Sequence, residues 1–267
     1  MNTRLPFALA AVAATLLLSA CATAPQAPKT LRVGYSPIYP PVIFSNHAGQ
    51  PMGVEADFAD ALADALHTQA EPIAYEWSQL IPALQDGEID IIMSGMTITP
   101  GRATQVLFCD PYMDNPLIAL ARAGEAASFP TAESILNAPI SIGALRGTSG
   151  EIFARRNCHS AKIVPVALRG DVPLHLASHR YKLYIDDLAA IVDIVRQSEA
   201  TLDPILIPLR EQKLAWAVAA DNAALRDAAN AALASWRNDG RLNTILHHWL
   251  LYRNATLESA SAPAVDQ

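Results

Sequence analysis

Four short segments of this chain hold the side chains that could do chemistry, and each follows a segment with the pattern of a β-strand. They are residues 36–39, 94–102, 147–149 and 186–187. In open α/β sheets, ligands bind beyond the carboxyl ends of the strands, where helix N-termini present free N–H groups. The segments contain fixed charges, hydroxyl groups and hydrogen-bond donors, but no nucleophile paired with a base. This set predicts a ligand-binding site and no catalytic residue.

The elements that would position these segments alternate between strand and helix patterns. Residues 31–34 form a short apolar strand, and a helical stripe of apolar residues follows at 58–66. A shorter stripe lies at 77–84, and residues 89–93 form the next apolar strand. This βαβα order predicts a mostly parallel sheet with helices on its faces.

The rest of the folded body repeats this alternation. Two α/β lobes of roughly a hundred residues each suit the pattern better than one large sheet. We expect residues 31–116 and 209–252 to form the first lobe and residues 117–208 the second, with residues 117–122 crossing between them in a two-segment hinge. The second lobe is expected to hold strands at 140–145, 163–167, 183–185 and 205–207 and helices at 151–157, 173–178 and 188–197, while helices at 222–236 and 242–250 complete the first lobe.

Composition and charge limit the class of protein. The chain has 267 residues, of which 51% are hydrophobic and 17% charged, so it can bury one large core or two modest ones. Its formal net charge is −7 and the sequence has no Lys/Arg-rich run, so nucleic acid is not an expected partner. No Cys-His spacing suits zinc, and the neighbours His247 and His248 would face different directions on a helix. We therefore expect neither a metal nor a cofactor.

The first 21 residues have the pattern of an export signal. Arg4 precedes an apolar stretch at 7–18 that is too short to span a bilayer comfortably. The ending Leu18-Ser19-Ala20-Cys21 resembles a bacterial lipobox, which implies that Cys21 is acylated and anchors the mature protein to a membrane. The alternative is an ordinary cleaved signal with a coincidental cysteine; both predict export. Residues 22–30 and 253–267 lack apolar periodicity and are expected to be a flexible tether and tail.

Two further cysteines, Cys109 and Cys158, remain in the folded body. An oxidising compartment would permit a disulfide between them, but they fall in different expected lobes. We therefore expect two unpaired cysteines, neither of them catalytic.

Six motifs extend this reading from residues to a family. Together they resemble the polar amino-acid family of bacterial solute-binding proteins, over residues 30–250, and the segment that ends at Arg102 is the most specific. The resemblance implies a two-lobed periplasmic-binding-protein fold and a monomer that captures an amino acid or similar zwitterion in the periplasm and delivers it to an inner-membrane ABC permease. The motifs are Gly34-Tyr-Ser-Pro-Ile-Tyr39-Pro-Pro, Gly53-Val-Glu-Ala-Asp57, Trp77-x-x-Leu-Ile-Pro-Ala-Leu84, Asp90-Ile-Ile-Met-Ser-Gly95-Met-Thr97-Ile-Thr99-Pro-Gly-Arg102, Phe108-Cys-Asp-Pro-Tyr112 and Gly147-Thr148-Ser149.

The resemblance implies roles for three residues of the first lobe. Arg102 would hold the ligand α-carboxylate, since a guanidinium matches a carboxylate bidentately and keeps its charge. Thr97 would add a hydroxyl or N–H donor, and Gly95 would let the backbone approach with its carbonyl toward the ligand ammonium. The alternative for Arg102 is a surface position in the first turn of a helix, where a cation opposes the helix dipole.

In the second lobe the resemblance implies three more contacts. Thr148 and Ser149 would close on the carboxylate from the other side, and Asp187 would pair with the α-ammonium. Each of the three could instead be a helix N-cap, a common use of these residue types, and both roles can coexist. The ligand would then be the only group that connects the two lobes' binding residues.

The ligand side chain is expected between two aromatic rings. Tyr39 and Trp77 resemble the family's aromatic pair, although single aromatic residues are also common in cores. Ser36 stands where relatives that bind cationic or amide side chains often have an acid, and Arg146 would favour an acidic or polar ligand unless it is only solvated. With no counter-charge at this end, the side chain is not expected to be strongly cationic.

Two other functions remain open. The resemblance extends to periplasmic cyclohexadienyl dehydratases, in which a carboxylate would act as general acid to expel water, and Asp186 is the only spare carboxylate expected near the site. The protein could also be a stand-alone sensor that presents its ligand to a membrane partner. Turnover of prephenate or arogenate would identify the enzyme, and a neighbouring permease would favour transport.

Overall fold

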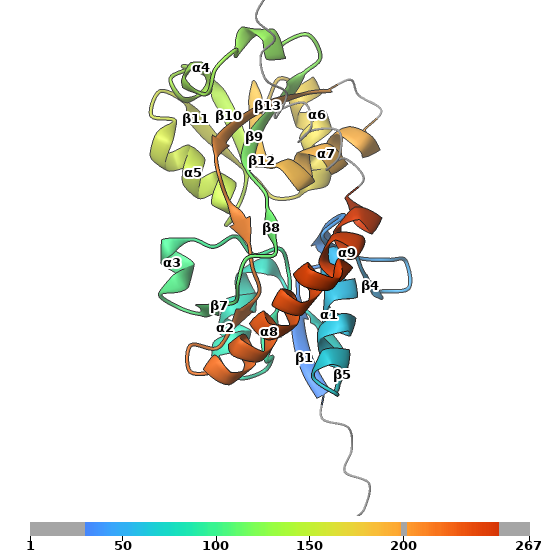
Figure 1. Ribbon diagram of the computed structural model, residues 1–267. Helices are drawn as coiled ribbons and strands as arrows, with labels where there is room; N and C mark the ends of the chain where they lie inside the picture. Colours follow the sequence, from blue (N-terminus) through green and yellow to red (C-terminus); the bar gives the residue numbers. More distant parts are fainter. Residues whose placement is uncertain (1–29, 199–201, 251–267) are drawn as a thin grey trace, which may run out of the picture.

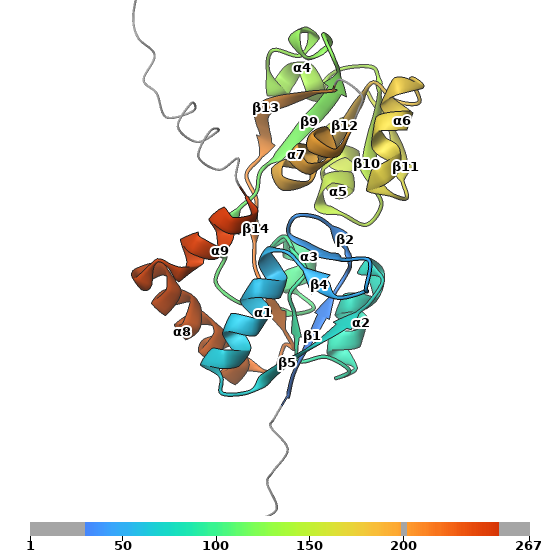
Figure 2. The ribbon, with the colours of Figure 1, turned by 90° about the vertical axis from the view of Figure 1, so that its right-hand side faces the viewer.

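The computed structural model describes residues 30–198 and 202–250. The expected signal peptide with Cys21, nearly all of the expected tether and the whole expected tail lie outside the described residues. The described residues form two α/β lobes, one above the other in Figures 1 and 2, with extended segments running between them. In this part of the chain no helix is both long enough and apolar enough to cross a membrane.

A five-stranded sheet is the centre of the first lobe, with strand order β5-β1-β6-β15-β7. β1 is parallel to β5 and β6, whereas β15 is antiparallel to β6 and β7. The strand β5 has no counterpart in the pattern analysis, because it is a mostly exposed edge strand without apolar alternation. The strands are β1 (Thr30–Tyr35), β5 (Gln69–Ala74), β6 (Ile91–Ile92), β7 (Leu107–Phe108) and β15 (Ala217–Val218).

Helices and a small second sheet cover this lobe. The helix α1 buries Phe58 and Leu62 completely and begins after Gly53. Gly53 has a φ of 119°, which other residues rarely adopt, and a side chain there would lie 2.6 Å from the Pro41 carbonyl oxygen. The helices α8 and α9 and the three-stranded sheet β2-β3-β4 pack on the same side as α1, whereas α2 belongs to a separate core cluster against β1 and β6. The bounds are β2 (Ile38–Tyr39), β3 (Ile43–Ser45), β4 (Pro51–Met52), α1 (Val54–Ala65), α2 (Leu80–Gln85), α3 (Pro100–Ala103), α8 (Ala223–Asp239) and α9 (Arg241–Trp249).

The second lobe is built on another five-stranded sheet, with order β11-β10-β12-β9-β13. β10 is parallel to β11 and β12, and β9 lies antiparallel between β12 and β13. Its strands are β9 (Leu117–Arg122), β10 (Ser141–Leu145), β11 (Lys162–Val166), β12 (Leu183–Asp187) and β13 (Leu202–Arg210), and its helices are α4 (Ala132–Leu136), α5 (Ser149–Asn157), α6 (Val172–Ala177) and α7 (Leu188–Gln197).

One expectation about the hinge was wrong. Residues 117–122 do not cross between the lobes but form β9, a buried strand of the second sheet. The crossings lie beside the short pair β8 (Met113–Asp114) and β14 (Lys213–Leu214), where the Asn115 N–H donates to the Gln212 carbonyl at 2.9 Å. Strand β9 is buried along nearly its whole length, so its sequence lacks the alternation of apolar and polar residues that marks a half-exposed strand. For that reason the segment was interpreted as a crossing between the lobes and not as a strand.

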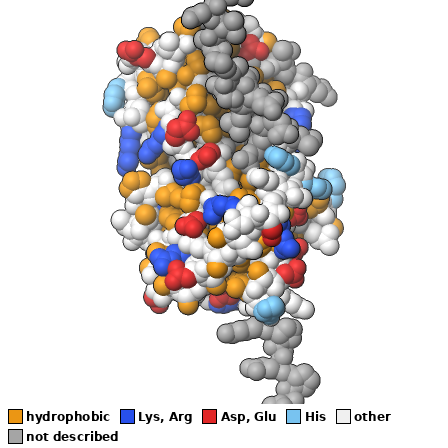
Figure 3. All heavy atoms as spheres, in the orientation of Figure 1, with side chains coloured by type: hydrophobic (Ala, Val, Ile, Leu, Met, Phe, Trp, Pro, Cys, Tyr) orange, Lys and Arg blue, Asp and Glu red, His pale blue; other side chains and the backbone are white. Residues whose placement is uncertain are grey.

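The two cysteines lie apart. Cys109 is buried in the core of the first lobe and Cys158 in the core of the second, and both are free. Burial, together with Asp110, raises the pKa of the Cys109 thiol to about 12, so it is a packing residue. On the face drawn in Figure 3, Lys and Arg side chains are interspersed with Asp and Glu.

Candidate functional site

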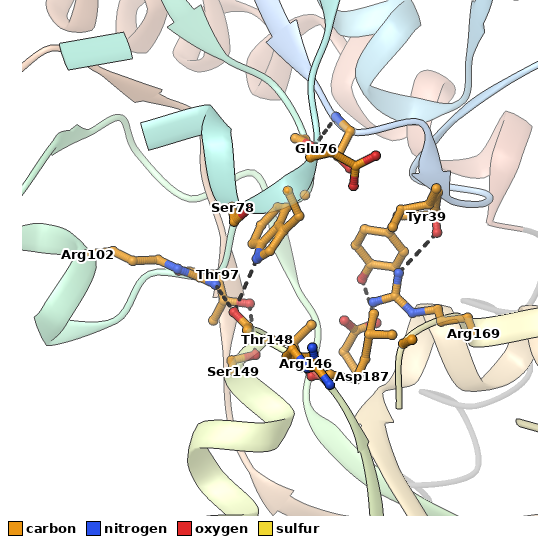
Figure 4. A pocket seen from close by; sticks show the side chains of 18 residues that line it. Tyr39, Glu76, Ser78, Thr97, Arg102, Arg146, Thr148, Ser149, Arg169 and Asp187 are labelled. Atoms are coloured by element: carbon orange, nitrogen blue, oxygen red, sulfur yellow. Dashed lines mark hydrogen bonds between the residues drawn. The ribbon is translucent and has the colours of Figure 1, made fainter. Parts of the chain in front are cut away.

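A cavity of about 280 Å³ lies between the two lobes, and every residue expected at the binding site lines it. The carboxyl ends of β1, β6, β10 and β12 point toward it, so residues that are far apart in the chain meet there (Figure 4). The first lobe contributes Ser36, Tyr39, Trp77, Gly95, Thr97 and Arg102, and the second contributes Arg146, Thr148, Ser149 and Asp187.

Arg102 is a buried cation whose partners are uncharged. It lies on the short helix α3, and its Nη1 donates to the Thr97 carbonyl at 2.9 Å while Nη2 lies 3.5 Å from the Gly147 carbonyl. The guanidinium carbon is 5.0 Å from the centre of the Trp77 ring. Among the described residues no carboxylate forms a salt bridge with it, and burial lowers its pKa to about 10. A buried guanidinium in this setting is suited to an anionic group from outside the protein.

Hydrogen bonds from buried groups fix the loop that precedes Arg102. Gly95 has a φ of 63°, and its N–H donates to the buried Glu55 carboxylate at 2.7 Å. A side chain at Gly95 would meet the Tyr39 ring at 2.6 Å. Ser36 adds a further tie, because its N–H donates to Ser94 Oγ at 2.9 Å. The glycine is therefore needed both for its backbone conformation and for the close approach of Tyr39.

Glu55 was not expected at the site, yet it organises this loop. Its carboxylate also accepts hydrogen bonds from the Tyr112 hydroxyl and from Trp216 Nε1, both at 2.7 Å. Burial raises the pKa of Glu55 to about 7, although the three donors oppose that shift. Tyr112 and Trp216 flank the two hinge crossings, so Glu55 links the loop to the hinge.

Asp187 ends β12 and caps α7. Its Oδ1 accepts hydrogen bonds from the Ala190 N–H at 3.0 Å and from the Tyr39 hydroxyl, whereas no described residue donates to its Oδ2. Burial and the neighbouring Asp186 raise its pKa to about 6, while Arg169 acts in the opposite direction. The capping alternative thus holds for one oxygen and leaves the other for a further partner.

Thr148 and Ser149 begin helix α5. The Thr148 hydroxyl donates to the Leu145 carbonyl at 2.7 Å and accepts from the Glu151 N–H at 3.4 Å, so it is a helix cap. The Ser149 hydroxyl donates to Gln212 Oε1 at 2.8 Å and lies 3.4 Å from Thr97 Oγ1. Both hydroxyl groups already have partners inside the protein.

Each of the two aromatic rings makes a cation–π contact with an arginine. The Trp77 ring lies against Arg102, and its Nε1 donates to the Gly147 carbonyl at 3.2 Å. The Tyr39 ring lies 4.4 Å from the guanidinium carbon of Arg169. Figure 4 shows Arg102 and Arg169 on opposite sides of the cavity, with Asp187 on the same side as Tyr39 and Arg169.

Three expectations about the site were wrong. Asp186 is not a spare carboxylate, because it accepts from Arg169 Nε at 2.9 Å and from the Tyr184 hydroxyl at 2.6 Å and does not line the cavity. The side-chain end of the cavity does have a negative charge, because Glu76 lines it. Nor is a ligand the only connection between the lobes, since Tyr39, Trp77 and Arg169 each make a direct interlobe hydrogen bond.

The residues that the sequence reading missed carried usable signals. Arg169 follows the carboxyl end of β11 by three residues, and Glu76 follows β5 by two. The same rule that selected the other segments would have included both, had β5 been recognised and the segment after β11 been examined. Asn115 and Gln212 carry no such signal, because they lie in the crossings.

A charged cavity between two α/β lobes, with a hinge of two chain segments, defines a two-lobed ligand-binding protein. The chain belongs to the bacterial extracellular solute-binding proteins, family 3, whose model matches residues 31–252. The two-lobed fold and the solute-binding function expected from the sequence are therefore confirmed.

The chain is also similar to curated relatives and solved structures that are named as amino-acid-binding proteins. The L-cystine-binding protein TcyJ of Escherichia coli K12 is 28% identical, with 82% of each chain covered. The histidine-binding periplasmic protein of the same organism is 27% identical, covering 83% of this chain and 88% of the relative. An ancestral arginine-binding protein bound to arginine superposes with a TM-score of 0.75 at 28% identity, covering 83% and 98% of the two chains. An ancestral amino acid-binding protein that is a precursor of cyclohexadienyl dehydratase gives 0.74 at 29%, covering 82% and 95%.

Proposed function

We propose that this protein binds a free α-amino acid between its lobes and delivers it to an ABC permease in the inner membrane. One observation carries the proposal: among the described residues, a buried arginine without a carboxylate partner and a buried carboxylate without a salt bridge line the same cavity from opposite lobes. Two unmatched opposite charges in one cavity suit a zwitterion, since each buried charge needs a partner. Relatives named for cystine, arginine and histidine support the same ligand class.

In this proposal each end of the ligand has its own partners. The Arg102 guanidinium receives the α-carboxylate, with Thr97 and the backbone N–H groups at the start of α5 beside it. Asp187 Oδ2 receives the α-ammonium while Oδ1 keeps its cap. The side chain lies between Trp77 and Tyr39 and meets Glu76 and Arg146 at the exposed rim.

We further propose that the protein acts as a periplasmic monomer held to a membrane by lipid on Cys21, and that it catalyses no reaction. Asp186, the residue a dehydratase mechanism would have used, is fully engaged by Arg169 and Tyr184. The relatives named as transport-binding proteins support a carrier role.

The test is a thermal-shift screen followed by calorimetry. The protein is unfolded in guanidinium chloride, dialysed and refolded to remove any copurified ligand, and screened with the twenty amino acids and L-cystine. A ligand at a hundred times its Kd adds about 2.7 kcal/mol to the free energy of unfolding. The amide and N-acetyl derivatives of the best ligand are the controls, because each lacks one of the two charges. Equal binding of either derivative would refute the proposed site.

A further inference from the structure

Arg169 makes contacts that a ligand's guanidinium group would otherwise make. Its Nε donates to Asp186 Oδ2 at 2.9 Å, its guanidinium carbon lies 4.4 Å from the Tyr39 ring centre, and its Nη1 donates to the Ile38 carbonyl at 3.2 Å. Asp186 is 1% exposed, and the Arg169 side chain is 14% exposed. Asp186 and Arg169 come from the second lobe, whereas Tyr39 and Ile38 come from the first.

These partners form a cation subsite. A carboxylate supplies the counter-charge, an aromatic face supplies a cation–π contact, and a carbonyl accepts a second hydrogen bond. The carboxylate is held in place, since the Tyr184 hydroxyl and the Asp187 N–H also donate to Asp186. The position of this carboxylate is therefore fixed within the second lobe, and the protein's own Arg169 side chain occupies the subsite.

A second cavity continues beyond Arg169. It has a volume of about 300 Å³, and Ile38 and Arg169 line both it and the ligand cavity. Its wall is mostly apolar, with Pro40, Leu168 and Pro173 among the lining residues. Arg169 thus separates two spaces that a smaller side chain would join. Figure 4 shows the residue beside Tyr39, opposite Arg102.

We propose that Arg169 determines ligand specificity by occupying a cation subsite, so that the protein takes neutral or acidic amino acids and rejects arginine and lysine. This inference rests on the proposed function. Once the ligand's two ends pair with Arg102 and Asp187, the charged side chains left along the cavity are Arg146, Arg169 and Glu76. Glu76 is exposed and screened by water, whereas the buried Asp186 is neutralised by Arg169. A long cationic side chain therefore finds its best partner already taken.

The test compares L-arginine with L-citrulline, its uncharged isostere, in three proteins. In the wild type we expect arginine to bind no better than citrulline. Arg169→Ala opens the second cavity and leaves Asp186 as an unpaired carboxylate, so arginine should gain at least about tenfold over citrulline, the effect of one hydrogen-bonded charge. Arg169→Ala/Asp186→Asn has the same space without the Asp186 charge, and its preference for arginine should disappear. Asp193, which also lines the second cavity, is present in both variants and cannot account for a difference between them.

The ratio of the two affinities within each protein is the readout, because losing an interlobe contact weakens every ligand equally. The double variant also removes both charges at once and so keeps the test valid if Arg169→Ala folds poorly: with the space open and no counter-charge from Asp186, arginine should have no advantage over citrulline, and an advantage of about tenfold there would overturn the inference. Arg156→Ala, which removes an exposed arginine from the same lobe, is the control for net charge and should leave the ratio unchanged. An unaltered ratio in Arg169→Ala overturns the inference alone. Failure of the wild type to bind any free amino acid overturns the proposed function, and this inference with it.

Discussion

Replacing Arg102 by methionine should move binding and stability in opposite directions. Methionine is about as long as the aliphatic part of arginine but carries no charge. Burial lowers the pKa of Arg102 from its ordinary value to about 10, which corresponds to a cost of about 3 kcal/mol for holding the charged form in the fold. The variant loses the hydrogen bond to Thr97 and the contact with Trp77, which offset part of that gain. We expect the free energy of unfolding to rise by about 1 to 2 kcal/mol, or about 2 to 8 °C in Tm.

Binding should weaken far more than stability improves. Two charge-assisted hydrogen bonds to a carboxylate contribute about 1.5 to 3 kcal/mol each, so the Kd should rise at least a hundredfold. Both quantities come from the same preparation, with scanning calorimetry for Tm and titration calorimetry for the ligand found in the screen. Arg156→Ala should change neither. Retained affinity, or a Tm several degrees below that of the wild type, would show that Arg102 is a structural residue whose charge the fold already satisfies.

Three further predictions concern Asp187, Glu55 and Cys21. Asp187→Asn should weaken binding at least about tenfold, and wild-type affinity should fall as the pH drops below about 6, where Asp187 takes up a proton. If the affinity does not change between pH 7 and pH 5, Asp187 does not pair with the ligand ammonium. The pKa of Glu55 is about 7 in the folded protein, above its unfolded value, so the folded protein keeps this proton to a higher pH. The free energy of unfolding should therefore fall by about 3 kcal/mol as the pH rises from about 4.5 to 7. Glu55→Gln should remove this part of the pH dependence, as measured by denaturant titrations at each pH. Cys21→Ser should abolish labelling by palmitate and membrane retention, and unchanged labelling would exclude lipidation at this residue.

Much of the fold followed from local pattern. Helix α7 matches the predicted range 188–197, because a capping aspartate and an apolar stripe define its start and inner face. The strand β5 and the short strands β2, β3 and β4 were not predicted, since exposed strands and strands of two or three residues carry no alternation that a sequence window can detect. The strand β9 was mistaken for a crossing for the opposite reason: it is apolar along nearly its whole length.

The residues at the ends of central strands were determined by the sequence alone. In parallel sheets the carboxyl ends of neighbouring strands meet at one edge, so Thr148 and Asp187 lie at the same edge of the second sheet, while Gly95, Thr97 and Arg102 follow β6 of the first sheet. The packing of the two lobes then brings both groups to one cavity. Their residue types already carried the charges and hydroxyl groups on which the proposed zwitterion site depends.

Only the tertiary structure decided how those charges are distributed among partners. Asp186 and Asp187 are neighbours in sequence, yet Asp186 is neutralised by Arg169, whereas Asp187 forms no salt bridge with any residue that the structure describes. That difference depends on which side of β12 each side chain occupies and on a residue seventeen positions earlier. Burial, which sets the pKa values of Arg102 and Glu55, likewise exists only in the folded protein, because desolvation depends on the atoms that surround a group and not on its neighbours in the sequence.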